Sequence, residues 1–293
     1  MHPLASDQRQ PESVAVRIFA PAKLNLFLHV LGRRPEDGLH ALQSLFVFLS
    51  LGDQVTFSPA EQNDLRMTPD MDVAREQNLA WRALSLVQGF APELPSVQVS
   101  VDKVIPTEAG LGGGTADAAA VVHWAEQYGY QRTGQTADIR SSLAGLGADM
   151  PPAMDQKARL WTGSGDQPGP RVLGLSGIPV LLLKPPTGVS TRACFTGLKG
   201  QFSPPVDWHP DASARDQIIA ARNDLEAPAQ TLNPEIATAL ASLGALPGVW
   251  LVRMTGSGSA CFALFDEKGP RDAALIQLRQ ALPTWWSAAA DIL

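Results

Sequence analysis

The sequence is poor in the residues that mark several classes of protein. It has two cysteines in 293 residues, Cys194 and Cys261. So little cysteine argues against a disulfide framework or a cysteine-based metal site and favours buried free thiols. Basic residues are also in deficit: the formal net charge is -6, whereas a nucleic-acid-binding protein normally shows a basic face. We therefore expect no nucleic-acid partner, and a phosphate-rich ligand must be bound by a local arrangement of donors.

Long apolar stretches are missing as well. The first thirteen residues are polar and lack the apolar core of a signal peptide. The longest uncharged run, residues 236–252, is interrupted by Pro247-Gly248, which makes it a poor membrane span. A hydrophobic content of 45% with 18% charged residues is typical of a soluble globular protein with material for two cores. We expect a cytoplasmic protein with no membrane partner.

The hydrophobic periodicity predicts an α+β protein with two domains. In the N-terminal half it predicts strands at residues 24–30, 44–51, 54–58 and 97–101, and helices at 76–88, from Thr115 onwards and at 137–146. In the C-terminal half it predicts strands at residues 178–183, 249–254 and 260–265, and helices at 235–243 and 271–281. Gly52-Asp53 is expected to form a turn between two strands. We divide the chain into an N-terminal domain, residues 1–163, and a C-terminal domain, residues 164–293.

The most informative stretch is rich in glycine. Residues 110–114 hold four glycines in five positions, so the backbone can turn its N–H groups towards an anion without obstruction by Cβ atoms. A helix that begins at Thr115, with this residue as its N-cap, adds free N–H donors and the positive end of its dipole. The Thr115 hydroxyl can bind a phosphate or a magnesium ion. The pattern predicts a phosphate-binding loop.

Three common phosphate-binding loops do not fit this stretch. A P-loop needs a lysine directly after its last glycine, and none follows here. A dinucleotide fingerprint that starts at Gly110 needs a glycine at position 115, which is threonine. A protein-kinase glycine loop is accompanied by a His-Arg-Asp segment, which the sequence lacks. A simple flexible turn without a ligand stays open as the alternative.

Residues 106–119 resemble the nucleotide loop of the GHMP kinases, which include galactokinase, homoserine kinase and mevalonate kinase. The resemblance implies the two-domain α+β fold of that family, with the active site in the cleft between the domains. It also implies ATP as co-substrate together with Mg²⁺. The residues that it assigns to nucleotide binding are Pro106, Thr107, Glu108, Ala109, Gly110, Leu111, Gly112, Gly113, Gly114, Thr115 and Ala116.

Further segments narrow the resemblance to one branch of the family. They occur in the order typical of that branch, at residues 20–26, 32–46, 77–79, 147–151, 223–226 and 255–258. This branch serves the non-mevalonate isoprenoid pathway. The implied reaction is phosphorylation of the 2-hydroxyl of 4-(cytidine 5′-diphospho)-2-C-methyl-D-erythritol by ATP.

Two residues are implied as catalytic. The resemblance makes Asp149 the base that accepts the proton of the substrate alcohol, and Lys23 its partner. Lys23 and Asn25 lie two residues apart on a predicted strand, hence on one face, so Asn25 can hydrogen-bond a substrate oxygen. A lysine at a strand start is often only a solvated edge residue. For Asp149 the alternative is a helix-capping residue before Pro151.

The substrate side of the site rests on fewer residues. The resemblance implies that His40 hydrogen-bonds the cytosine and that Phe195 lies on one side of the base. The position next to His40, aromatic in the family, is Leu39, which buries apolar area but loses about 1 kcal/mol of ring stacking. The turn at residues 256–258 either brings backbone amides to the ligands or is a simple hairpin turn.

Two other functions stay open on the sequence. One is a GHMP kinase for another small alcohol, such as homoserine or mevalonate, and the other is a non-catalytic nucleotide-binding protein with the same fold. Residues 32–46 favour the cytidine substrate, and the presence of both Lys23 and Asp149 favours catalysis. No residue is predicted as a protein ligand of a metal, because the histidines have no suitable spacing. We expect a monomer or homodimer that acts on a small molecule.

Overall fold

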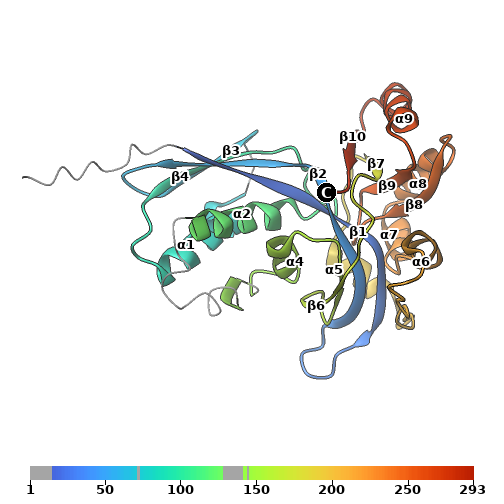
Figure 1. The fold of residues 1–293 in the computed structure, drawn as a ribbon, viewed down its shortest axis with the longest axis horizontal. Coiled ribbons are helices and arrows are strands. Elements are labelled where there is room, and N and C mark those ends of the chain that lie inside the picture. The colour runs from blue at the N-terminus through green and yellow to red at the C-terminus, as the bar shows by residue number, and fades with distance from the viewer. Residues whose placement is uncertain (1–14, 71–72, 128–140, 144) are drawn as a thin grey trace, which may run out of the picture.

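Two long antiparallel strands run through the molecule. The computed structural model describes residues 15–70, 73–127, 141–143 and 145–293. Strand β1 (Val16–Arg33) pairs with β2 (His40–Pro59) along most of its length. In Figure 1 the pair extends from the helices at the left of the view to the second group of strands and helices at the right. The strands thus connect both parts of the protein.

The strands form two sheets. Within the described residues the first sheet has the order β3-β4-β2-β5-β6, with β1 paired to β2, and the second has the order β10-β7-β9-β8. The remaining strands of the first sheet are β3 (Asp64–Thr68), β4 (Val97–Asp102), β5 (Arg159–Thr162) and β6 (Gln167–Arg171). Those of the second are β7 (Pro179–Lys184), β8 (Val249–Met254), β9 (Cys261–Phe265) and β10 (Trp286–Asp291). The domain division at residue 163 stays a prediction; β5 and β6, on either side of it, pair with each other.

The helices cover the two sheets separately. Helices α1 and α2 pack on each other and α2 packs on β1 and β2, while α8 packs on β8 and β9, and α9 on β7 and β10. Beside the first sheet lie η1 (Arg75–Gln77), α1 (Leu79–Phe90), α2 (Gly113–Gln127) and α4 (Met150–Asp155). The later helices are α5 (Thr191–Gly197), α6 (Ala214–Ala220), α7 (Glu226–Leu232), α8 (Glu235–Gly244) and α9 (Lys268–Ala281). The predicted α+β class is confirmed.

The regular elements with strong periodicity agree with the sequence prediction. Strands β4, β7, β8 and β9 and helix α8 begin within one residue of their predicted starts. Helix α1 begins three residues later than predicted because Asn78 caps it: its Oδ1 accepts from the N–H groups of Ala80 and Trp81 at 2.9 and 3.4 Å. Short elements such as β3, β10 and α5 to α7 were not predicted, since few turns of periodicity mark them.

The predicted turn at Gly52-Asp53 is wrong, because β2 continues through both residues. Gly52 lies opposite Pro21, beside a shift in the pairing register of β1 and β2. A Cβ atom at residue 52 would overlap the Ala20 carbonyl and lie 2.7 Å from the Phe19 ring. Glycine is therefore needed for close approach of the strands and not for chain reversal. Asp53 is fully buried.

The start of α2 also differs from the prediction. The helix begins at Gly113, and the carbonyl of Gly112 already accepts from Ala116 N–H at 2.9 Å. Thr115 thus lies inside the first turn and is not the N-cap. Residues 137–140 and 144 of the predicted helix at residues 137–146 lie outside the described residues; of the rest, 141–143 are helical and 145–146 form a turn. The first thirteen residues, considered above for a signal peptide, also lie outside them.

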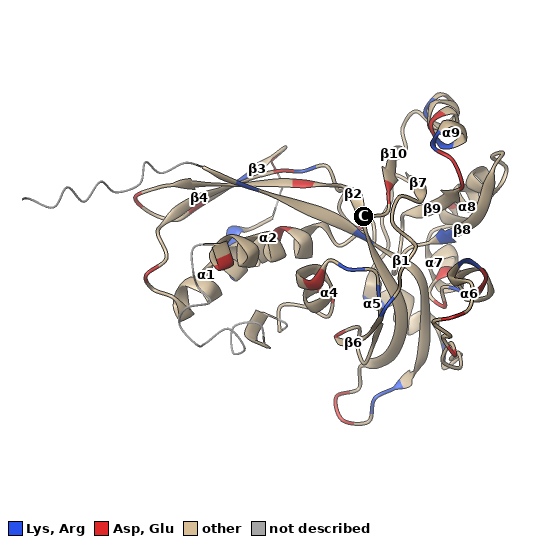
Figure 2. Ribbon diagram, in the orientation of Figure 1, with Lys and Arg blue, Asp and Glu red and all other residues tan. Residues whose placement is uncertain are grey.

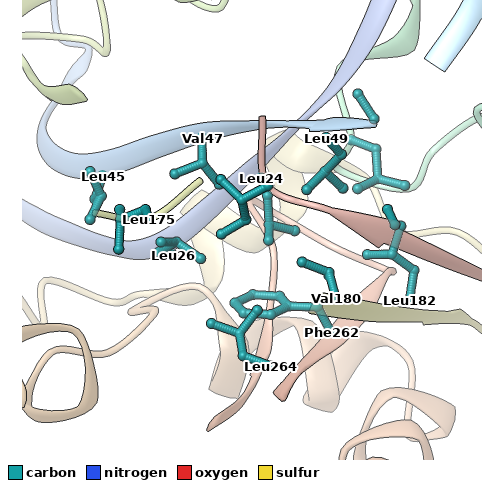
Figure 3. Close-up of a cluster of buried hydrophobic side chains, with 14 of the residues drawn as sticks. Leu24, Leu26, Leu45, Val47, Leu49, Leu175, Val180, Leu182, Phe262 and Leu264 are labelled. Carbon is teal, nitrogen blue, oxygen red and sulfur yellow. The ribbon is translucent and has the colours of Figure 1, made fainter. Parts of the chain in front are cut away.

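A buried apolar cluster joins the two sheets. Figure 3 shows Leu24 of β1 and Val47 of β2 facing Leu182 of β7 and Phe262 of β9. All four are completely buried. Because β1 and β2 share this core with the second sheet, the predicted site residues Lys23 and Asn25 on β1 are held in a fixed relation to the C-terminal half.

The distribution of charged residues and the state of the two cysteines agree with what the composition indicated. Figure 2 shows acidic and basic segments interspersed over the outer helices and loops of the described chain, while the middle of β1 and β2 is mostly tan. Cys194 and Cys261 are buried and unpaired, as predicted. Among the described residues no helix is long and apolar enough to cross a membrane.

Candidate active site

Two cavities meet at the glycine-rich loop. The first measures about 600 Å³ and is lined by residues of both halves, among them Lys23, Asp149 and Phe195. The second measures about 330 Å³ and lies between the loop, the start of α2 and residues 77–79. Glu108, Gly110, Gly112 and Thr115 line both cavities. A ligand in the second cavity can therefore reach the first across the loop.

Nearly all of the predicted nucleotide-binding loop lines the second cavity. The lining residues are Pro106, Thr107, Glu108, Ala109, Gly110, Leu111, Gly112, Gly113, Gly114 and Thr115. Ala116 differs: it is 3% exposed and belongs to the core under α2, so it lines neither cavity. Its small side chain allows α2 to pack closely against the sheet.

The loop depends on glycine at two positions. Gly110 and Gly112 have φ angles of 72° and 71°, in the left-handed region that favours glycine. A Cβ atom at residue 112 would lie 2.8 Å from Cγ of Lys23. At residue 110 it would meet the turn at residues 255–258, at 3.1 Å from Gly258 N. The glycines therefore bring this loop into contact both with Lys23 and with the turn of the C-terminal half.

Lys23 is a buried ammonium at the junction of these segments. The residue is 8% exposed, its Nζ donates to Asn25 Oδ1 at 2.5 Å, and it lies 3.6 Å from Asp149 Oδ2. It also lies 5.4 Å from the centroid of the Phe46 ring, within range of a cation–π contact. Lys23 is not a solvated edge residue, and the structure brings it together with Asp149.

Asn25 is held in place by three hydrogen bonds. Besides accepting from Lys23, its amide donates to Ser44 Oγ at 2.8 Å, and its backbone N–H donates to Thr255 Oγ1 at 2.9 Å. Ser44 in turn donates to the Phe27 carbonyl at 2.6 Å. Lys23 and Asn25 line the same cavity, as their spacing on β1 predicted. In this arrangement Asn25 orients Lys23.

The Asp149 carboxylate is accessible and does not cap a helix. Asp149 occupies the N-cap position of α4, but its side chain makes no capping hydrogen bond. The side chain is 37% exposed and lines the first cavity. The alternative role as a capping residue is thus not supported, and the carboxylate is available to a bound alcohol.

The three residues predicted to surround the cytosine differ in their position relative to the first cavity. Phe195 lines the first cavity, whereas His40 does not and stacks on Phe195, with ring centroids 4.8 Å apart. Leu39 is 52% exposed. Burial, and then the charge of Arg33, lowers the pKa of His40 below its ordinary value, so its imidazole is neutral near pH 7.

A buried charge cluster beside the second cavity was missed by sequence reasoning. Lys103 Nζ bonds to Asp53 and, at 2.7 Å, to Asp117 Oδ2; both Lys103 and Asp117 line the cavity. Burial, opposed by Lys103, raises the pKa of Asp117 to about 7. Burial alone would lower the pKa of Lys103, but the charges of Asp117 and Asp53 outweigh it and raise that pKa. Asp53 fastens the cluster to the chain by accepting from the N–H groups of Val104 and Ile105.

Known proteins match this chain along nearly its whole length. Residues 78–157 match the family described as GHMP kinases N terminal domain, and residues 211–284 match GHMP kinases C terminal. The chain is 38% identical to the 4-diphosphocytidyl-2-C-methyl-D-erythritol kinase of Novosphingobium aromaticivorans, over 95% of this chain and 93% of that protein.

Solved structures show the same fold. A crystal structure of 4-(cytidine 5′-diphospho)-2C-methyl-D-erythritol kinase superposes with a TM-score of 0.78 at 32% identity, covering 94% of this chain and 99% of that one. Homoserine kinase from Cytophaga hutchinsonii superposes with a TM-score of 0.62 at 13% identity, covering 96% of each chain. The second likeness shows the fold alone. The predicted two-domain GHMP kinase fold is confirmed.

Proposed function

The chain belongs to the 4-diphosphocytidyl-2-C-methyl-D-erythritol kinases of the GHMP kinase family, and from this premise we propose which residues perform the transfer. The enzyme phosphorylates the 2-hydroxyl of 4-(cytidine 5′-diphospho)-2-C-methyl-D-erythritol, a step of the non-mevalonate isoprenoid pathway. Membership of this family confirms the activity predicted from the sequence. ATP is the phosphoryl donor, as membership of the GHMP kinases implies.

Two cavities suit the two substrates. We assign the nucleoside part of ATP to the second cavity and the alcohol to the first, with the phosphates crossing the loop where Glu108, Gly110, Gly112 and Thr115 line both. Loop N–H groups and the N-terminus of α2, a helix of 15 residues, then face the phosphates. Such preorganised donors stabilise the charge of the transferring group.

Asp149 is the proposed base and Lys23 the electrostatic partner. The carboxylate takes the proton of the 2-hydroxyl, the alcohol oxygen bonds to the γ-phosphorus, and the bond from that phosphorus to the β-phosphate oxygen breaks, so that ADP leaves. The Lys23 ammonium, 3.6 Å from Asp149, stabilises the negative charge of the phosphoryl oxygens. The Lys23–Asp149 pair in a cavity shared with the loop is the observation that carries this proposal.

Magnesium fits the oxygen donors at the junction of the cavities. Thr115 and Glu108 line both cavities, and Asp149 lines the first; their hydroxyl and carboxylate oxygens are of the kind that Mg²⁺ prefers as ligands. Among the described residues no group of three or more histidine, cysteine or acidic side chains forms a metal site. We propose that Thr115 and one carboxylate would hold Mg²⁺ together with the phosphates of ATP, and that the ion would supply neutralisation of phosphate charge.

The cytosine is assigned to the face of Phe195. His40 now covers part of this ring, so its imidazole must move aside for the base to stack there. A neutral imidazole can both donate to and accept from the base. A monomer or homodimer and a cytoplasmic location stay predictions.

A coupled ADP-release assay tests the function. The wild type is given ATP and Mg²⁺ with the cytidine diphosphate alcohol, and in parallel with homoserine or mevalonate. We expect ADP release with the cytidine substrate and none with homoserine or mevalonate. Release only with homoserine or mevalonate would replace the substrate, and ATP binding without release on any alcohol would point to a non-catalytic protein.

A further inference from the structure

We propose that Asn223 is a positioning residue for the phosphoryl transfer. Its amide holds the turn at residues 255–258, which lines the first cavity together with the Lys23 side chain. The proposal rests on the proposed function in one respect: Lys23 is taken as the group that stabilises the transferring phosphoryl.

Both the NH₂ group and the oxygen of the Asn223 side chain form hydrogen bonds inside the protein. The residue is 6% exposed, and its Nδ2 donates to the carbonyls of Met254 and Gly256, both at 2.8 Å. Its Oδ1 accepts from Leu225 N–H at 3.0 Å. Both donor hydrogens thus bind the carbonyls at the beginning of the turn. Replacing the amide removes both hydrogen bonds to these buried carbonyls, which favours a shift of the turn.

The turn lies close to Lys23 and lines the same cavity. Gly256 has a φ of 57°, and a Cβ atom there would lie 3.0 Å from Lys23 Nζ and 3.3 Å from Asn25 Oδ1. The hydroxyl of Thr255 accepts from Asn25 N–H at 2.9 Å. A displacement of residues 255–256 therefore reaches Lys23 directly and through Asn25.

The segment around Asn223 is also fastened to the strand that carries Lys23. Leu28 N–H donates to the Arg222 carbonyl at 3.0 Å, and Asp224 N–H donates to the Leu28 carbonyl at 2.9 Å. The segment around Asn223 therefore links β1, the strand that carries Lys23, with the turn, and loss of the Asn223 amide removes the two hydrogen bonds of this link. Its role is positional, because Asn223 itself does not line the first cavity.

A second buried asparagine provides a matched control. Asn233 is also 6% exposed; its Nδ2 donates to the Thr187 carbonyl at 3.0 Å, and its Oδ1 accepts from Glu235 N–H at 3.0 Å. The two residues thus share burial and the bond to residue i+2. They differ in that Asn233 donates to a loop carbonyl and not to residues 254–258.

The test compares Asn223→Asp with Asn233→Asp. Each change keeps the size and the acceptor oxygen but removes the donor hydrogens. We expect kcat of Asn223→Asp to fall about 10- to 100-fold, the effect of a misplacement of the order of 1 Å, with KM for ATP within about threefold. Asn233→Asp should keep kcat within about twofold of the wild type, a change too small for lost transition-state contacts. Equal losses in both variants, at matched folded fractions from thermal melts, would overturn the proposal.

The pH dependence gives a second readout. A buried carboxyl beside two carbonyls has a raised pKa, and once protonated it regains one donor hydrogen. The kcat of Asn223→Asp relative to the wild type should therefore rise from about pH 8 towards about pH 6, whereas a constant ratio contradicts the proposal. If the wild type itself releases no ADP, the proposed function fails. The NMR resonance of the Lys23 Cε atom then decides: it should shift in Asn223→Asp and stay unchanged in Asn233→Asp.

Discussion

The Nζ atom of Lys23 lies 3.6 Å from Oδ2 of Asp149, although one residue is on β1 and the other precedes α4. The lysine is buried while the carboxylate is partly exposed towards the first cavity. An ammonium beside an accessible carboxylate is the arrangement expected where the carboxylate accepts a proton from a bound alcohol.

Asp149→Asn should reduce kcat by about 10²–10⁴-fold, the usual contribution of a general base. KM for ATP should change little, because the loop that lines the second cavity is untouched. Steady-state kinetics with the cytidine substrate measure both. Asp155→Asn, at the end of the same helix and paired with Arg159 at 2.8 Å, is the control and should keep wild-type turnover. A fully active Asp149→Asn enzyme would remove this residue from the mechanism.

Gly112→Ala should lose both activity and stability. Gly112 has a φ of 71°, and an alanine at this φ lowers the free energy of unfolding by about 1–2 kcal/mol. The new Cβ atom would also lie 2.8 Å from Lys23 Cγ and displace the lysine. Urea unfolding and turnover measure the two effects. Gly89→Ala is the control: this site at the end of α1 has nothing within 4 Å of the new Cβ, so we expect a gain of roughly 0.5–1 kcal/mol. Unchanged turnover in Gly112→Ala would show that Lys23 tolerates displacement.

Leu39→Tyr should lower KM for the cytidine substrate. An added aromatic stack is worth about 0.5–1.5 kcal/mol, hence a few-fold change in KM, with KM for ATP unaltered. The comparison is Leu173→Tyr, another exposed leucine, 83% accessible and outside the first cavity, which should leave KM unchanged. Equal KM values for Leu39→Tyr and the wild type would place the base away from residue 39.

Asp117→Asn should change how stability depends on pH. Because the folded pKa of Asp117 is raised to about 7 from 3.8, the native state holds a proton between these values that the unfolded state has lost. Stability from this group therefore falls as pH rises from about 4 to about 7, by at most roughly 1.4 kcal/mol per pH unit. Urea unfolding at several pH values should give a flatter profile for the variant. Parallel profiles would show that Asp117 stays ionised in the native protein.

Local patterns in the sequence were enough for the strong elements and for the chemistry of the loop. Four glycines followed by a helix predicted an anion-binding turn, and the structure gives Gly110 and Gly112 left-handed φ angles there. Spacing on a strand placed Lys23 and Asn25 on one face. The same local reasoning failed at Gly52, where the glycine serves a close approach between strands and not a turn.

The sequence by itself determined the family and predicted the glycine loop together with a set of site residues, because these depend on residue types and on short spacings along the chain. Only the tertiary structure decided which partners they have. The folded chain brings Asp149 to within 3.6 Å of Lys23, and the core that joins both sheets holds the turn at Gly256 close to the same lysine. The same folding encloses Asp53 and Asp117 around Lys103. Such contacts join residues far apart in the chain, and no periodicity of neighbouring residues encodes them.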